Sequence, residues 1–259
     1  MNHHPGVVAH RGFSGNAPEN TIAAFRLAID AGCDGMELDI QRLSDGTLVV
    51  FHDTDTGRIT GAKGNIYDLT LAESRLLDAG SRFNSAFPEK ARPEYAGLRI
   101  PTLQEVFHLA AESAVELLIE IKNPELYQPD LESDLLALTR DCRMEHRVRF
   151  LSFSAESIGK MKKLDPSART ALLASRLWRN PIKEALEAEA GELGLLHTLA
   201  TPETIAAARR SGLSVSVWTV NEENDMRLMI ERGADCIITN YPDRLLKILR
   251  RDHRSPGDI

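Results

Sequence analysis

The fold is decided by residues 35–53, GMELDIQRLSDGTLVVFHD. Two runs rich in apolar residues, 35–41 and 47–52, indicate strands. The short connection between them contains an Asp-Gly turn signal, and it is too short for the crossover that joins parallel strands. We therefore expect one antiparallel hairpin. A turn centred between Ser44 and Asp45 pairs residues whose numbers sum to about 89, so His52 returns opposite Glu37.

Outside this hairpin, short apolar runs alternate with longer stretches of helical spacing. The other expected strands are residues 7–10, 115–122, 148–153, 170–173, 193–197, 214–220 and 235–240. Capping residues and helical spacing predict helices over 20–31, 102–113, 201–210 and 221–232. Strands that alternate with helices at about thirty residues per unit predict an α/β fold, a closed (β/α)8 barrel of the TIM type. We expect a single domain, residues 1–259.

Residues 54–100 do not follow this alternation. They are rich in Thr, Gly, Asn and Pro, and they contain a helix start at 69–73. A structureless connection of that length is unusual inside a compact domain. We therefore expect residues 54–100 to form a small inserted subdomain after the second barrel strand.

The charge balance argues against several kinds of partner. The chain has 31 Lys and Arg against 38 Asp and Glu, a formal charge of −7, which disfavours nucleic acid and anionic membrane surfaces. Cys33, Cys142 and Cys236 have no C-x-x-C spacing, so we expect reduced, buried thiols. The sequence contains no signal-peptide pattern and no long apolar run, and a cytoplasmic location is expected. No pattern indicates the oligomeric state.

Charged residues stand near the carboxyl ends of the expected strands, where the active sites of such barrels lie. Glu37 and Asp39 are two residues apart and therefore share a face of their strand, here the barrel interior. Glu120 and Lys122 repeat this spacing on the next barrel strand. Three inward carboxylates repel one another unless a cation lies among them, and oxygen ligands favour Mg²⁺ or Ca²⁺. The alternative is an ion-pair network without a metal.

Two histidines flank these carboxylates. His10 ends the first expected strand and His52 ends the return arm of the hairpin. An imidazole with a pKa near ~6.5 can serve as a general acid or a general base at neutral pH. Arg11 and Lys122 add two cations that suit a phosphate. Together these groups predict cleavage of a phosphoester.

The order of motifs along the chain resembles that of the glycerophosphodiester phosphodiesterases, most closely the compact bacterial cytosolic form. The motifs are His10-Arg11-Gly12, Pro18-Glu19-Asn20-Thr21, Glu37-Leu38-Asp39, Phe51-His52-Asp53, Glu120-Ile121-Lys122, Trp218-Thr219-Val220-Asn221 and Thr239-Asn240-Tyr241-Pro242-Asp243. They span nearly the whole chain. The resemblance implies a TIM-type barrel with an insertion after the His-Asp motif. It also implies hydrolysis of small glycerophosphodiesters, such as glycerophosphocholine or glycerophosphoethanolamine, to glycerol 3-phosphate and an alcohol.

The resemblance also assigns roles to individual residues. It makes His10 and His52 the acid and base pair. We assign His10 as base and His52 as acid, although the sequence does not choose between the two orders. Glu37, Asp39 and Glu120 become the ligands of one divalent cation, and Arg11 and Lys122 hold the phosphate. Glu19 faces the site and orients its neighbours, while Trp218 forms a wall for glycerol or packs as part of the barrel top. The chain departs from the family at Asn240, where an acidic residue is common, and at residues 54–58, which replace the usual Leu-x-Arg context.

Two other functions are considered. Barrel phosphodiesterases of the sphingomyelinase D and phosphatidylinositol-specific phospholipase C types combine two histidines with charge at the mouth, but they act on membrane lipids. A non-catalytic module that binds a glycerophosphodiester is the second, although loss of a catalytic histidine or carboxylate is then expected and none is lost. The sequence does not choose the alcohol, the metal, or direct water attack over a cyclic intermediate.

Overall fold

Eight parallel strands follow one another around a closed ring. The structure is a computed structural model that describes residues 4–122, 130–176 and 180–252. β1 pairs with both β9 and β2, and these two pairings close the sheet into a barrel, which confirms the predicted fold. The strands are β1 (Gly6–His10), β2 (Gly35–Arg42), β4 (Glu116–Ile121), β5 (Val148–Ser152), β6 (Thr170–Ala174), β7 (Glu192–Leu196), β8 (Ser214–Trp218) and β9 (Cys236–Thr239).

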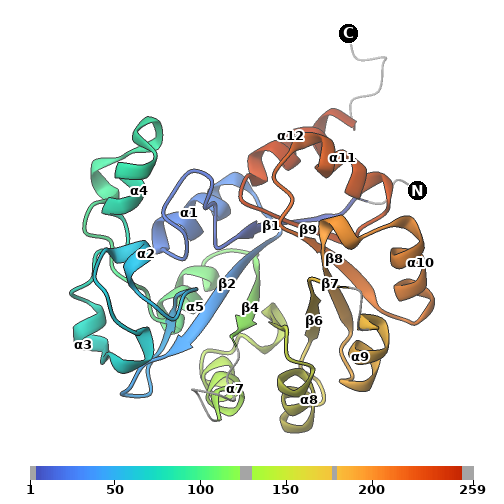
Figure 1. Cartoon of the computed structure of the whole chain (residues 1–259), viewed down its shortest axis with the longest axis horizontal. Helices are drawn as coiled ribbons and strands as arrows, with labels where there is room; N and C mark the ends of the chain where they lie inside the picture. The colour runs from blue at the N-terminus through green and yellow to red at the C-terminus, as the bar shows by residue number, and fades with distance from the viewer. Residues whose placement is uncertain (1–3, 123–129, 177–179, 253–259) are drawn as a thin grey trace.

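Helices cover the outside of the barrel (Figure 1). They are α1 (Ile22–Ala31), α5 (Leu103–Ala111), α7 (Leu131–Asp141), α8 (Ala155–Leu164), α9 (Pro181–Glu187), α10 (Pro202–Arg210), α11 (Glu223–Glu231) and α12 (Pro242–Asp252), with the 3₁₀ turns η4 (Glu145–Arg147) and η5 (His197–Leu199). Helix α5 begins with the capping box of Thr102 and Glu105. Helix α1 differs from the expectation that it begins at Asn20, because its N-cap is Thr21, whose side chain accepts from the Ala24 N–H.

The predicted hairpin is present, but its register differs by one residue. β3 (Leu48–Val50) runs antiparallel to β2, with Ile40 opposite Val50, so paired numbers sum to 90. The reason is a three-residue turn, 44–46, whose last residue Gly46 has a φ of 86°. The ladder ends before His52, and the expectation that His52 lies opposite Glu37 is wrong.

Residues 54–100 form short helices beside the hairpin and α1 (Figure 1). The elements are α2 (Gly57–Thr60), η1 (Ile66–Asp68), α3 (Leu71–Ser74), α4 (Ser81–Ala86), η2 (Pro88–Lys90) and η3 (Pro93–Tyr95). Phe51 of the hairpin arm packs with Ile66 and Ile100 in a separate apolar cluster. This segment also contacts the loop after β1, because Lys90 Nζ donates to the Gly15 carbonyl and the Tyr95 hydroxyl donates to the Asn16 carbonyl. That the segment is a subdomain of a single-domain chain stays a prediction.

The barrel interior is filled below the site by apolar side chains. Val8, Leu118, Leu151, Ala171, Leu173, Cys236 and Ile238 form this inner cluster, and a larger core lies between the strands and the helices. Alternate residues of a barrel strand point inward, so the same alternation that fills the interior also aims charged residues into the mouth. The apolar layer therefore supports the polar groups above it.

All three cysteines are free thiols, as expected. Cys33 and Cys236 are buried, whereas Cys142 is half-buried, which corrects the expectation that every thiol is buried. Within the described ranges, no helix is both long enough and apolar enough to cross a membrane.

Candidate active site

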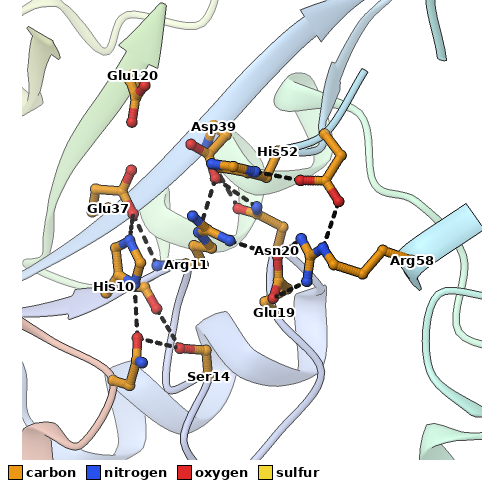
Figure 2. A network of polar contacts seen from close by, with 12 residues as sticks. His10, Arg11, Ser14, Glu19, Asn20, Glu37, Asp39, His52, Arg58 and Glu120 are labelled. Carbon is orange, nitrogen blue, oxygen red and sulfur yellow. Dashed lines mark hydrogen bonds and ion pairs between the residues drawn. The ribbon is translucent and has the colours of Figure 1, made fainter. Parts of the chain in front are cut away.

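The candidate site lies where β1, β2 and β4 end. Strand register places His10 of β1 beside Glu37 of β2, and Asp39 of β2 beside Glu120 of β4. Residues in register on neighbouring strands share a face of the sheet, so these four side chains point into the barrel mouth. All three carboxylates are buried. Figure 2 shows Glu37 and Glu120 facing each other across the site.

The three carboxylates form a cluster in which one oxygen of each lies within 4.8 Å of the others. Burial raises the pKa of Glu37 well above its usual range, and repulsion from Asp39 and Glu120 raises it further. Burial likewise raises the pKa of Glu120 to about 7. Buried carboxylates that resist ionisation in each other's presence are the donor set that a hard divalent cation stabilises.

Two cations neutralise part of this cluster. Lys122 Nζ lies 2.7 Å from Asp39 Oδ1 and 2.6 Å from Glu120 Oε1. Arg11 Nε lies 3.3 Å from Asp39 Oδ2. Although burial acts to raise the pKa of Asp39, Lys122 and Arg11 lower it below the usual range. The ion pairs of the alternative hypothesis therefore exist.

Glu37 differs from the other two carboxylates. Its Oε2 accepts the Arg11 backbone N–H at 3.0 Å and lies 3.8 Å from His10 Nε2. Among the described residues no Lys or Arg side chain pairs with it. The ion-pair network thus leaves one buried carboxylate without a cationic partner, and this donor set fits a metal ion.

His10 is hydrogen-bonded to Asn240, which directly follows β9. Its Nδ1 lies 2.7 Å from Asn240 Oδ1, an atom that can only accept, so Nδ1 donates and Nε2 carries the lone pair. Burial, together with the charge of the adjacent Arg11, lowers the pKa of His10 to about 4. His10 is therefore a neutral imidazole near pH 7, with Nε2 turned toward Glu37.

His52 belongs to a chain of alternating charges. Its Nδ1 lies 2.5 Å from Asp53 Oδ1, and Asp53 Oδ2 accepts from Arg58 Nε. Arg58 also donates to both oxygens of Glu19, at 2.9 and 2.7 Å, and Glu19 Oε1 accepts from Arg11 Nη1 at 2.8 Å. Figure 2 shows this chain running from His52 through Arg58 and Glu19 back to Arg11. Burial lowers the pKa of His52, while Asp39 and Asp53 act in the opposite direction.

Asn20 joins the site from the loop before α1. Its Nδ2 donates to Asp39 Oδ2 at 2.8 Å, and its backbone has a φ of 56°, in the left-handed region. Asn is among the residues that adopt this conformation most readily. Since Thr21 supplies the helix cap, the conformation of Asn20 serves the contact with Asp39.

A pocket of about 180 Å³ collects these groups. Its polar side comprises His10, Arg11, Glu37, His52, Glu120 and Lys122, and its apolar side comprises Leu151, Phe153, Leu173, Trp218 and Ile238. The Trp218 ring meets the Phe153 ring edge to face, with centroids 5.4 Å apart. The polar side of the pocket suits a charged group of a ligand, and the apolar side suits its carbon atoms.

Comparison with known proteins identifies the family. The model of the glycerophosphoryl diester phosphodiesterase family matches residues 10–244. The chain belongs to this family. The match begins at His10 and extends past Asn240, so it includes every residue of the pocket.

Relatives and solved structures agree with this assignment. A glycerophosphodiester phosphodiesterase of Caldanaerobacter subterraneus subsp. tengcongensis is 39% identical over 245 residues, which are 95% of this chain and 98% of that protein. One from Bacillus subtilis is 38% identical over 252 residues, 93% of this chain and 85% of that protein. A structure of an Oleispira antarctica phosphodiesterase in complex with the product sn-glycerol-3-phosphate has a TM-score of 0.83 and 28% identity, covering 95% of this chain and 97% of that one. The predicted family, barrel fold and enzyme class are confirmed.

The structure brings the predicted site residues of this family together. His10, Arg11, Glu37, His52, Glu120, Lys122 and Trp218 line one pocket, and Asp39 and Glu19 contact its cations. Sequence reasoning did not assign roles to Arg58, Asn20 and Asn240, which bond the predicted residues. Arg58 lies within residues 54–58, where the sequence differs from the Leu-x-Arg context usual in the family, so the motif comparison gave no reason to single it out.

Proposed function

We propose that this member of the family hydrolyses small glycerophosphodiesters, such as glycerophosphocholine or glycerophosphoethanolamine, to glycerol 3-phosphate and an alcohol. One observation carries the proposal: a single pocket holds two histidines with different bonding partners beside three clustered carboxylates. The product bound to the Oleispira antarctica phosphodiesterase is the product expected of this reaction.

Glu37, Asp39 and Glu120 would hold one divalent cation, Mg²⁺ or Ca²⁺. The support is the donor set itself, three buried carboxylates of which Glu37 has no cationic side-chain partner among the described residues. A bound divalent cation would neutralise charge on the phosphate diester and polarise it toward attack.

Arg11 and Lys122 would bind the phosphate. Both line the pocket and both already contact Asp39, which fixes their positions before substrate arrives. Preorganised cations beside a phosphate stabilise the charge that develops in the transition state, because no reorientation is needed during reaction.

His10 would be the base. Its lone pair is on Nε2 and its low pKa keeps it neutral, so Nε2 can take the proton of the attacking water or of the glycerol 2-hydroxyl. As the new bond to phosphorus forms, the bond between phosphorus and the alcohol oxygen breaks. Attack by water gives glycerol 3-phosphate directly, whereas attack by the 2-hydroxyl gives a cyclic phosphate that a water must then open. His52 would donate a proton from Nε2 to that oxygen. The Asp53 carboxylate at Nδ1 would stabilise the imidazolium form against the burial that lowers the pKa of His52.

Glu19 would act as a positioning residue through its bonds to Arg11 and Arg58. Trp218, packed on Phe153, would form the wall that contacts the carbon atoms of glycerol. The substrate class is a small molecule, and the predicted absence of nucleic acid and membrane partners and the cytoplasmic location stay predictions.

The reaction is tested by release of glycerol 3-phosphate from glycerophosphocholine by the purified chain. We expect EDTA to abolish release and added Mg²⁺ or Ca²⁺ to restore it. If no diester is cleaved with either metal while glycerophosphocholine raises the melting temperature, the protein is a binding module. Release of choline from sphingomyelin, without cleavage of glycerophosphocholine, would instead favour a sphingomyelinase D type of activity.

A further inference from the structure

A second, larger cleft of about 510 Å³ lies beside the catalytic pocket. Its inner wall includes Glu19 and Arg58, and its outer wall includes Arg82, Phe83 and Phe87 in and next to α4. Figure 1 shows α4 standing out beside α1, and Figure 2 shows Glu19 and Arg58 at the edge of the site.

The inner wall connects this cleft to the group that protonates the leaving alcohol. Arg58 binds Asp53, and Asp53 binds His52. An alcohol that leaves on the His52 side therefore faces Arg58 and Glu19. Ligand pockets commonly occupy about 300–1,000 Å³, so the 180 Å³ catalytic pocket alone is small for an entire diester. The cleft on the far side of Glu19 and Arg58 offers further volume of about 510 Å³.

The charge of the cleft is unbalanced toward positive. Its carboxylate, Glu19, is already bound by Arg11 and Arg58, and those bonds lower its pKa although burial acts to raise it. Arg82 Nε donates a hydrogen bond to the backbone carbonyl of Arg58 at 3.0 Å, and this bond orients the Arg82 guanidinium. Within the described residues no carboxylate pairs with Arg82.

The rest of the outer wall is mainly apolar, with one further cation beside it. Phe83 and Phe87 pack with ring centroids 5.0 Å apart and make part of the outer wall apolar. Lys90 Nζ lies 5.4 Å from the Phe87 centroid and adds a second cation next to the cleft. A choline or other cationic group would meet like charge here, whereas a carboxylate or phosphate would meet Arg82.

We propose that this cleft binds the alcohol half of the substrate and that Arg82 makes the enzyme prefer alcohols that carry a negatively charged group. The proposal rests on the proposed function. It assigns specificity to Arg82, which neither binds the reacting phosphate nor contacts the histidines.

The test uses two diesters that differ by one carboxylate, glycerophosphoserine and glycerophosphoethanolamine, at saturating metal. We expect kcat/KM to be higher for the serine ester. Arg82→Gln should lower the ratio of the two kcat/KM values about 3- to 5-fold, mainly through KM, as expected for one partly exposed ion pair. Arg82→Lys should keep most of the ratio. Arg92→Gln, at an exposed arginine paired with Glu94 on the same segment, is the matched control and should not change it.

A second variant tests the cleft without changing charge. Ala86 lines the cleft on α4, and Ala86→Trp should raise KM for both esters while leaving cleavage of the methyl ester of glycerol phosphate unchanged. A wild-type preference for the ethanolamine ester, or an unchanged ratio in Arg82→Gln, would overturn the proposal but not the reaction. Failure to cleave any of the three diesters would instead overturn the proposed function, and the assignment of the cleft with it.

Discussion

Both ends of the barrel contain clustered charges, but only one end leaves them unbalanced. At the amino end, Arg149 lies 2.5 Å from Glu192 and 3.1 Å from Glu116, and Arg169 lies 2.8 Å from Glu116. Two cations face two carboxylates, and each carboxylate has an arginine. At the carboxyl end, three buried carboxylates face Arg11 and Lys122, and Glu37 has a backbone N–H and a neutral histidine instead of a cation.

This difference distinguishes charges that support the fold, at the amino end, from charges of the candidate site, at the carboxyl end. At the amino end each desolvated ion has a partner, whose attraction offsets part of the cost of its burial. Excess negative charge at the carboxyl end costs stability, as the raised pKa values of Glu37 and Glu120 indicate. Excess buried negative charge at that end is what the proposed divalent cation would offset.

The largest expected effect concerns the carboxyl end alone. His52→Ala should lower kcat by roughly 10²- to 10⁴-fold, the range for a lost acid or base group, with little change in melting temperature. Steady-state release of glycerol 3-phosphate measures the effect. His108→Ala, at an exposed position of α5, is the control and should be silent. An unchanged kcat would remove His52 from the mechanism.

A comparable change at the amino end should affect stability instead. Arg149→Met leaves Glu192 buried without its arginine, and loss of one partner of a buried pair costs about 3 kcal/mol. Urea unfolding measures this cost. The kcat of the folded variant should stay at the wild-type value, and a large fall in kcat at preserved stability would contradict the division between the two ends.

The smallest expected effect is a gain in stability. The pKa of Glu37 is raised in the fold, so the folded protein holds this proton to a higher pH than the unfolded chain, and stability is lost as pH rises above about 4.5. In EDTA, Glu37→Gln should therefore melt at a higher temperature than the wild type. The expected gain is roughly 2–4 °C for each kcal/mol of relieved repulsion. The gain should increase as the pH rises above 4.5, where Glu37 of the wild type begins to lose its proton in the unfolded chain.

With a bound divalent cation, the wild type should melt at a higher temperature than Glu37→Gln. A cation that binds the folded state raises its stability in proportion to the logarithm of its concentration, and Glu37→Gln weakens that binding. Melting curves of both proteins with and without Mg²⁺ or Ca²⁺ test this. A wild type that stays more stable than the variant in EDTA across this pH range would show that the carboxylates are adequately paired without metal.

The barrel and most of the site could be predicted because their signals are local. Alternation of strands and helices predicts the barrel, and the two-residue spacing of Glu37 and Asp39 predicts which face they share. Parallel strands then bring these residues to the same end as His10 without further information.

The remaining features depend on contacts between distant segments. The predicted hairpin register is wrong by one residue, because Gly46 adds a third residue to the turn. A shift of one residue in strand pairing changes which residue of β2 would lie opposite His52. The contact of Asn240 with His10 joins residues at opposite ends of the chain, and no periodic pattern reports such a pair. Asn20 looked like a helix cap because Asn favours caps, but Thr21 beside it took that role.

Arg58 has a consequence for protein engineering. It lies on the segment that forms the outer cleft, yet its guanidinium bonds Glu19 and Asp53, which in turn bond Arg11 and His52. Lys90 and Tyr95 of the same segment hold the loop that leads to Glu19. Exchange of residues 54–100 between relatives would therefore change selectivity and turnover together. A transplant that keeps these three anchors offers a way to alter the accepted alcohol while the catalytic geometry is inherited intact.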